Sequence, residues 1–199
     1  MQSKEKTGIH VEGHIKIWDP ISSEIYVNKR NAIHFENFSI ALANGIANSG
    51  QQYIYKMALG NGGTSVDPTG IITYLTPNSS GSNASLYNET YTKVVNSRSA
   101  DNPDPTRNYL SVLHTTGNNY TDVVVTCLLD YGEPTNQSAY DTTPNGEQEY
   151  VFDELGLQSY DQQGKNMLLT HVVFHPVQKS LNRLVQIDYT VRIQTLTGV

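Results

Sequence analysis

Three apolar-periodic runs follow one another near the end of the chain and predict its core. In Leu184–Ile193 every second residue is apolar, and the apolar face consists of Val185, Ile187, Tyr189, Val191 and Ile193. Strict alternation predicts a β-strand with one buried and one solvent-facing side. Met167–Val177 is apolar on both sides, which predicts a central strand covered on both faces. Tyr150–Leu157 predicts a third strand, and the short connectors 158–165 and 178–183 favour antiparallel hairpins between the three.

The first part of the chain mixes strand and helix patterns. Residues 9–28 alternate as a β-hairpin does, with turn residues at 19–23. From Phe35 to Ser49 the apolar spacing changes to three and four residues, which predicts one α-helix that ends at Gly50. The apolar positions of this helix are Phe35, Phe38, Leu42 and Ile46. Gln52–Leu59 then predicts another strand.

The pattern weakens in a polar, loop-rich middle at about 76–119, flanked or interrupted by two short candidate strands at 71–75 and 86–95. Tyr120–Leu129 predicts a clear strand again, and 132–148 is a long polar loop. These elements predict a mainly β protein with one domain spanning residues 1–199. We expect an antiparallel β-sandwich or barrel-like sheet that carries one α-helix at about 35–49 and long polar loops, with both chain ends in the same core.

Composition narrows the classes of partner. Of the 199 residues, 16% are charged and the formal net charge is −6. Nucleic acid is therefore not expected as a partner, because binding phosphates needs clustered Lys and Arg. The first residues are charged and no apolar run of signal or membrane length follows them, so we expect synthesis in a cytoplasm, no signal peptide and no membrane contact. Cys127 is the single cysteine, which excludes an internal disulfide and a cysteine-based zinc site.

Two His-x-x-x-His pairs, His10/His14 and His171/His175, are candidate metal ligands. On a helix this spacing would bring both rings to one zinc ion. Both pairs lie in predicted strands, where four residues span roughly 13 Å, too far for two ligands of one metal. The sequence therefore predicts no metal site and no cofactor.

Other candidates for catalysis also have simpler interpretations. Asp153 and Glu154 are adjacent in a predicted strand, so they should point to opposite faces, and Glu154 should end or bend the strand. Gly60–Gly63 lacks the Lys-Ser/Thr of a phosphate loop and is interpreted as a turn that needs positive φ angles. No Ser lies in a nucleophile elbow, and Cys127 should be an inert core residue. We therefore expect a protein that is not an enzyme.

Four phrases of the sequence together resemble a known class of proteins. They are Asn31–Asn37, Ala58–Thr64, Phe152–Leu157 and Leu168–Ser180. In combination they resemble virion structural proteins of tailed bacteriophages, in which a Phe-x-Glu-Leu/Ile-Gly-Leu strand precedes a Leu-Leu-x-His strand that ends in a Pro and a Lys-Ser. The resemblance covers the two ends of the chain and not its polar middle. It implies a building block of a neck, tail or baseplate ring, and it implies no catalytic residues.

The expected function is thus that of a non-enzymatic structural subunit of the virion, in a neck or tail ring or a connector. Its partners would be copies of itself, in a homo-oligomeric ring, and other virion proteins. The alternatives are a receptor- or glycan-binding tip module and a capsid decoration protein, with a polysaccharide or peptidoglycan hydrolase ranked below them. Tyrosines in or beside the polar loops suit subunit contacts, because Tyr combines contact area with a hydrogen bond. The candidate contact residues are Tyr109, Tyr131 and Tyr140.

Overall fold

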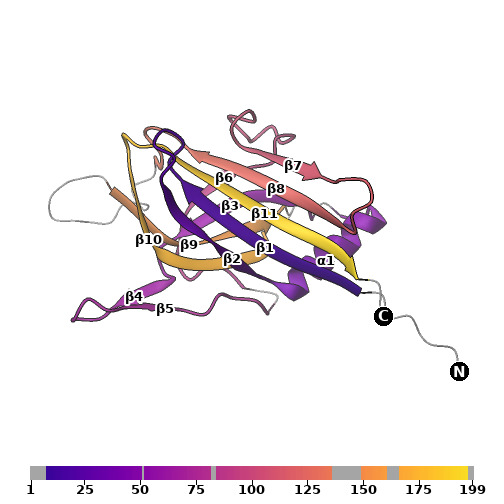
Figure 1. Ribbon diagram of the computed structural model, residues 1–199, viewed down its shortest axis with the longest axis horizontal. Coiled ribbons are helices and arrows are strands. Elements are labelled where there is room, and N and C mark those ends of the chain that lie inside the picture. The colour runs from indigo at the N-terminus through magenta and orange to yellow at the C-terminus, as the bar shows by residue number, and fades with distance from the viewer. Residues whose placement is uncertain (1–7, 51, 82–83, 136–148, 161–165, 197–199) are drawn as a thin grey trace, which may run out of the picture.

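The computed structural model describes residues 8–50, 52–81, 84–135, 149–160 and 166–196. This part of the chain is mainly β: a curled antiparallel sheet of nine strands forms a half-barrel, and it carries one short helix (Figure 1). The elements are β1 Gly8–Trp18, β2 Ile25–Ile33, α1 Phe35–Ala47, β3 Ile54–Gly60, β4 Thr64–Val66, β5 Ile72–Tyr74, β6 Glu89–Val94, β7 Tyr109–Leu113, β8 Tyr120–Leu129, β9 Glu149–Ser159, β10 Thr170–Ser180 and β11 Val185–Leu196.

The strands of the large sheet follow the order β6-β3-β9-β10-β2-β1-β11-β8-β7, while β4 and β5 form a separate two-stranded hairpin. The two terminal strands of the chain, β1 and β11, pair along their whole described length, from Gly8↔Leu196 to Trp18↔Gln186. By contrast, β10 joins β2 through only two residue pairs, Thr170↔Ile33 and His171↔Ala32. The sheet therefore bends at this narrow junction, and its two halves curl around a common interior.

The sequence pattern predicted most of these strands correctly. In β11, Val185, Ile187, Tyr189 and Val191 are fully buried, as the alternation requires, and Ile193 is partly buried. β10 is buried on both faces over Thr170–Phe174, which confirms the prediction of a central strand. β8 has the predicted bounds, and the helix, predicted to run to Ser49, ends at Ala47.

One predicted hairpin is wrong. β10 and β11 are joined by only four residues, 181–184, yet they are not neighbours: β2 and β1 lie between them in the sheet. β11 instead pairs with β1 on one side and with β8 on the other, so both of its edges are occupied. A short connector permits a hairpin but does not require one, and here the chain uses it to cross from one half of the curled sheet to the other.

The interior holds one main apolar cluster to which strands from both halves contribute. Ile15 and Ile17 of β1 meet the buried face of β11 there, so the two ends of the chain share one core, as expected. Cys127 of β8 is fully buried in this cluster, and burial raises the pKa of its thiol to about 12. This confirms that Cys127 is an inert core residue.

The polar middle contains more structure than its pattern indicated. Two short strands, β4 and β7, were not predicted, because runs of three to five residues are too short to show a clear period. Segment 97–107, in the middle of this polar region, is also ordered within its own chain. It is held by buried amides: Asn102 Nδ2 donates to Asn108 O at 2.8 Å, and Asn108 Oδ1 accepts from the N–H of Leu128 at 2.9 Å.

Candidate functional site: an apolar groove between α1 and β1

Two adjacent carboxylates organise one end of the half-barrel. Glu154 is fully buried and accepts from the N–H groups of Gly62, Tyr87 and Asn88 at 3.1, 2.9 and 2.8 Å. His171 Nε2 lies 3.0 Å from Glu154 Oε2, while His171 Nδ1 accepts from the N–H of Asn78 at 2.8 Å. Burial raises the pKa of Glu154, but the hydrogen bonds from His171 and from the three N–H groups outweigh it and lower that pKa below its usual value.

Asp153, its neighbour, binds the next stretch of the same glycine-rich segment. Its carboxylate accepts from the N–H groups of Gly63 and Thr64, each at 2.9 Å, and from the Thr64 hydroxyl. The register of β9 with β10 shifts beside Asp153, between Val173↔Glu154 and Val177↔Phe152. Strand β9 continues beyond Glu154 to Ser159, so Glu154 does not end the strand, and of the two predicted alternatives the register shift is compatible only with a bend. The pair is a structural anchor, because backbone donors occupy the carboxylates.

The glycines of this segment serve close approach and not positive φ, contrary to the sequence-based interpretation. No glycine among Gly60, Gly62 and Gly63 has a positive φ. A Cβ on Gly60 would instead lie 2.4 Å from the carbonyl oxygen of Asn88, and one on Gly62 would lie 2.8 Å from the Asn88 nitrogen. The absence of side chains lets the segment pack directly against its neighbours and deliver its N–H groups to Asp153 and Glu154.

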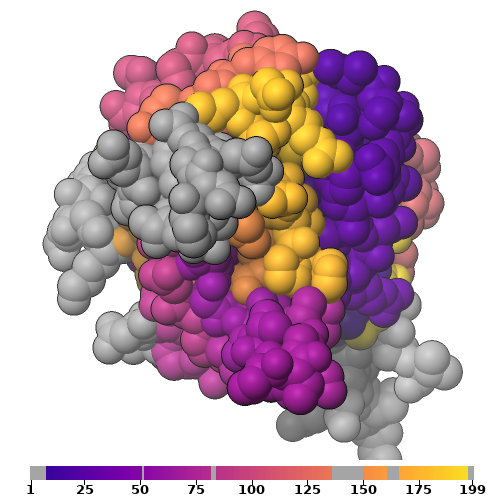
Figure 2. Space-filling model, turned by 90° about the vertical axis from the view of Figure 1, so that its left-hand side faces the viewer, coloured from indigo at the N-terminus to yellow at the C-terminus, as the bar shows by residue number. Residues whose placement is uncertain are grey.

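This anchor holds the root of a projecting hairpin, which we call the β4–β5 arm (residues Thr64–Leu75). The root is further closed by the bond from the N–H of Leu75 to Gly63 O at 2.8 Å. At the tip, Asp67 Oδ1 accepts from Thr69 and Ile71, which fixes the turn. The arm stands out from the body as a knob (Figure 2). Its large exposed apolar side chains are Val66, Ile71, Tyr74 and Leu75.

Helix α1 is positioned at its start by buried polar contacts. His34 is the N-cap: its Nδ1 accepts from the N–H of Asn37 at 3.3 Å, and its Nε2 lies 2.9 Å from Gly81 O. Asn37 Nδ2 donates to Leu168 O at 2.9 Å, and Asn37 is the one buried residue of the helix. The helix ends at Asn48, which adopts the left-handed conformation that commonly closes helices.

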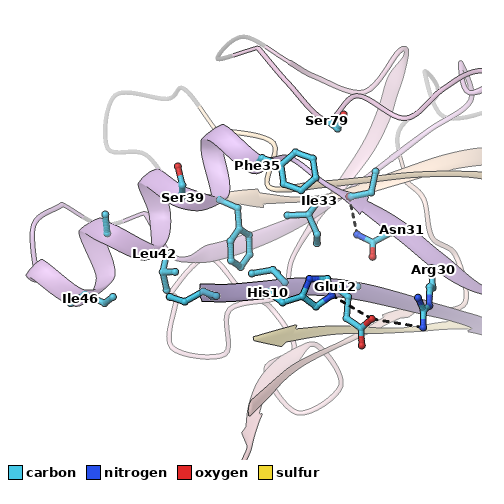
Figure 3. A pocket seen from close by; sticks show the side chains of 16 residues that line it. His10, Glu12, Arg30, Asn31, Ile33, Phe35, Ser39, Leu42, Ile46 and Ser79 are labelled. Carbon is cyan, nitrogen blue, oxygen red and sulfur yellow. Dashed lines mark hydrogen bonds and ion pairs between the residues drawn. The ribbon is translucent and has the colours of Figure 1, made fainter. Parts of the chain in front are cut away.

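The apolar stripe of α1 is open to solvent. Phe35 is 70% exposed and Ile46 is 78% exposed, while Phe38 and Leu42 are only partly buried. Together with the first half of β1 and the end of β2, this stripe lines a groove of about 850 Å³ (Figure 3). Its apolar lining includes Ile9, Val11, Ile33, Phe35, Phe38, Leu42 and Ile46. No helix in the described ranges, α1 included, is long and apolar enough to cross a membrane.

One wall of the groove is a strand edge without a partner in the described structure. β2 pairs with β1 only from Gly13↔Asn31 to Trp18↔Ile25, and beyond Asn31 it turns toward β10. Residues Gly8–Glu12 of β1 therefore pair with β11 on one side and with no described strand on the other. An unpaired edge presents backbone N–H and C=O groups that can pair with a further strand. The groove thus combines an apolar helix face with an open strand edge.

Charged and polar groups lie at one end of the groove. Arg30 Nη2 lies 3.8 Å from Glu12 Oε2, and His10 Nε2 lies 3.9 Å from the same oxygen. Asn31 donates to the hydroxyl of Tyr189, while its buried Oδ1 has no hydrogen-bond partner in the structure. Gly13 makes room for this side chain, since a Cβ there would lie 1.8 Å from Asn31 Oδ1.

The predicted contact tyrosines lie elsewhere. Tyr109 is partly buried in edge strand β7, and Tyr131 is 53% exposed on the turn after β8. An ion pair of 2.6 Å between Arg107 and Asp130 ties together the two segments that carry them. Neither tyrosine lines the groove, and Tyr140 lies outside the described residues.

The turn that carries Tyr131 is held by two lysines. Lys179 Nζ is buried and donates to Asp130 O, Glu133 O and Ser180 O at 2.8–3.0 Å. Burial lowers the pKa of Lys179 to about 8. Lys93 Nζ donates to the Glu133 carboxylate and to Leu128 O. Tyr131 is therefore presented to solvent from a firmly anchored turn.

The histidine pairs lie in strands, as predicted. His10 and His14 belong to β1, and His171 and His175 belong to β10. His171 is buried against Glu154, whereas His175 is exposed and its Nδ1 lies 3.2 Å from the Tyr74 hydroxyl. Within the described residues no group of three or more His, Cys, Asp or Glu side chains is placed to hold a metal ion.

The sequence analysis did not identify the groove. Its signal was the helical spacing of Phe35, Phe38, Leu42 and Ile46, which predicts a helix but does not say whether the rest of the fold covers it. Comparisons with protein-family models, with curated proteins and with solved structures give no match. The geometry of the chain itself therefore carries the functional argument.

Proposed function

We propose that this chain is a non-enzymatic structural subunit of a tailed-phage particle. In this proposal it belongs to a neck or tail ring or a connector, and it assembles through contacts with copies of itself and with other virion proteins. The proposal rests on one observation above all: the groove and the β4–β5 arm expose large apolar side chains that the described fold leaves uncovered. Contiguous exposed apolar surface on a soluble protein marks an interaction site.

Two further features support this proposal. The adjacent carboxylates of Asp153 and Glu154 accept hydrogen bonds from backbone N–H groups and anchor the arm, so their role in this proposal is structural. The sequence resemblance to tailed-phage virion structural proteins supports the same proposal, in which the chain is made in a host cytoplasm and built into the virion. Its motifs include Phe152–Leu157, which contains both carboxylates.

Purified particles test the proposal. We expect the chain to be present in virions at a stoichiometry that matches a ring, and electron microscopy of labelled particles should place it at the neck or tail. Limited proteolysis compares free and assembled states: the exposed β4–β5 arm should be cut in the free subunit and protected in the particle. Absence from particles that are otherwise complete would refute the proposal, and a label on the capsid surface would favour a decoration protein.

A receptor- or glycan-binding module is the second candidate, and one surface favours it. Tyr53 stacks on Tyr160 with ring centroids 5.3 Å apart, beside a second groove of about 540 Å³ whose lining includes Asn96 and Arg98. Aromatic rings with nearby polar groups are suited to sugars, because a ring packs on the apolar face of a sugar while amides bond its hydroxyls. Binding of host-surface polysaccharide that is lost on Tyr53→Ala, by a protein that does not self-associate, would favour this candidate.

A further inference from the structure

We infer that the groove between α1 and β1 accepts the β4–β5 arm of a second copy of this chain, with β5 adding as a strand to the open edge of Gly8–Glu12. This inference rests on the proposed function, and it names the contact by which subunits would join. The partner surface is thus a short strand with apolar side chains, and its source is the same sequence.

The groove is built to receive a strand. Addition of an extended segment to an exposed sheet edge gains backbone hydrogen bonds, while pockets beside the edge select the side chains. Here the edge is the first half of β1, and the pocket beside it is formed by α1. Phe38 and Leu42 belong to its lining, and Figure 3 shows Leu42 on the side of α1 that faces β1. A flat apolar patch would accept many shapes, whereas an edge beside an apolar wall favours an extended chain.

The arm has the complementary features. β5 pairs with β4 at Ser65↔Thr73 and its neighbours, and no other described strand pairs with it, so its outer edge is open. Ile71 is 63% exposed, and Tyr74 and Leu75 are also exposed. An isolated two-stranded hairpin is marginally stable in water at best. The fold nevertheless anchors this hairpin through Asp153 and Glu154, which preorganises it and reduces the entropy lost when it binds.

Size and charge also match. Helix α1 has 13 residues and is roughly 20 Å long at 1.5 Å per residue. Each side of the arm has about five residues before the turn, or roughly 16 Å. The arm carries one charge, at Asp67, and the groove ends at Arg30, whose side chain is 82% exposed. In the proposed contact the carboxylate at the tip of the arm would meet the exposed guanidinium of Arg30, whose partner within the subunit is Glu12 at 3.8 Å.

The positions of the two surfaces decide the kind of assembly. The arm and the α1 groove lie at opposite ends of the molecule (Figure 1). A contact between two different surfaces is heterologous, and its repetition closes a ring or continues as a filament. The arm has twelve residues, 64 to 75, whereas a stable interface uses about 20–30 residues a side. One arm alone therefore makes a weak contact, and closure of the ring with further contacts stabilises it.

Two variants that each block one surface test the inference. Ile46→Glu places a charge in the groove, and Ile71→Glu places one on the arm. Each variant alone should stay monomeric in sedimentation velocity at concentrations where the wild type associates. At higher protein concentration, where a single contact forms without ring closure, their mixture should form a dimer with one copy of each, because each variant retains the surface that the other has lost. Val112→Glu is the matched control: Val112 is 70% exposed on β7, outside both surfaces, and this variant should associate like the wild type.

A cysteine pair traps the same contact when it is short-lived. Cys127 is buried, so Phe35→Cys and Ile71→Cys copies, mixed and treated with a short thiol crosslinker, should give a crosslinked dimer only when both are present, because Ile71 lies beside Asp67 and Phe35 lies nearer than Ile46 to the Arg30 end of the groove. The inference is overturned if the mixed glutamate variants remain as monomeric as each alone and the cysteine copies do not crosslink. It is also overturned if Val112→Glu abolishes association as strongly as the other two variants. If the chain is found in particles but either of these results is obtained, the arm contact is refuted and the proposed function stands. If the cysteine copies crosslink but the chain is absent from particles, the arm contact stands and the proposed function is refuted.

Discussion

Strand β11 and helix α1 each carry one apolar stripe, and the fold treats the two stripes in opposite ways. The stripe of β11 is fully buried from Val185 to Val191, between β1 and β8 in the sheet and against the facing half of the curl. The stripe of α1 begins with Phe35 and ends with Ile46, both more than two-thirds exposed. Burial of apolar surface is the main stabilising term in folding, so the stripe of β11 stabilises the protein along its length, whereas in α1 it is Phe38 that packs against the main cluster. The exposed part of the α1 stripe is available for association.

Removal of one side chain from each stripe should give the largest contrast. Ile187→Ala in β11 should lower the free energy of unfolding by about 2–5 kcal/mol, because burial is lost and a cavity remains. Ile46→Ala in α1 should change it by no more than about 0.5 kcal/mol. Urea denaturation measures both, with Gln186→Ala on the opposite face of β11 as a nearly silent control. Similar losses for the two isoleucines would show that the α1 stripe is packed within the monomer.

The buried carboxylate behind the arm should respond next most strongly. Glu154→Gln replaces an acceptor of several N–H groups with an amide that must also donate, so we expect a loss of roughly 1–3 kcal/mol. The arm should then be cut faster by proteases. Glu36→Gln, in the exposed first turn of α1, is the matched control.

The carboxylate of Glu154 should also make the stability of the protein depend on pH. Because the folded-state pKa of Glu154 lies below its usual value, the ionised carboxylate contributes stability that is present above that usual value and lost as the pH falls through the folded-state pKa. Wild type should therefore lose more stability on acidification than Glu154→Gln does, as thermal denaturation across a pH series will measure. Equal acid sensitivity would mean that Glu154 is not ionised in the native state.

A smaller effect should come from the helix itself. A Cβ on Gly45 would meet no atom within 4 Å, so Gly45→Ala should stabilise the protein by about 0.5–1 kcal/mol through helix propensity alone. Gly156→Ala should do the opposite, since a Cβ there would lie 2.4 Å from the carbonyl oxygen of Thr170. A rise in melting temperature for Gly45→Ala and a fall for Gly156→Ala would show that helix propensity limits the stability of α1, whereas steric fit limits which side chain the interior accepts at Gly156.

A substitution at Phe35 should have the smallest effect on stability but a clear effect on dye binding to the exposed apolar surface. Phe35→Ser should leave the free energy of unfolding within about 0.5 kcal/mol of the wild type. It should, however, weaken the binding of a dye that fluoresces on apolar surface, because Phe35 is the largest exposed side chain of the groove. Ile21→Ser, at a side chain that is 70% exposed and lines neither groove, should leave dye binding nearly unchanged. If both variants retain full dye binding, the groove is not the apolar surface that the dye detects.

Local sequence determined the elements whose pattern is long and regular. Tyr120–Leu129 has the predicted bounds, β11 has its predicted buried face, and α1 begins at the predicted Phe35. These follow from the sequence because alternation and helical spacing depend only on which face of an element is apolar. The mainly β class with one helix in the described chain followed from the same patterns.

Tertiary structure decided which elements meet. It put β1 and β2 between β10 and β11, and it used the carboxylates of Asp153 and Glu154 to anchor a glycine segment that comes from 90 residues earlier in the chain. It also decided that the stripe of β11 is covered while that of α1 is exposed at Phe35 and Ile46, although both stripes are regular in the sequence. The spacing of apolar residues shows that one face of an element is apolar. Whether that face is buried depends on contacts between residues far apart in the chain, and no local pattern encodes those contacts.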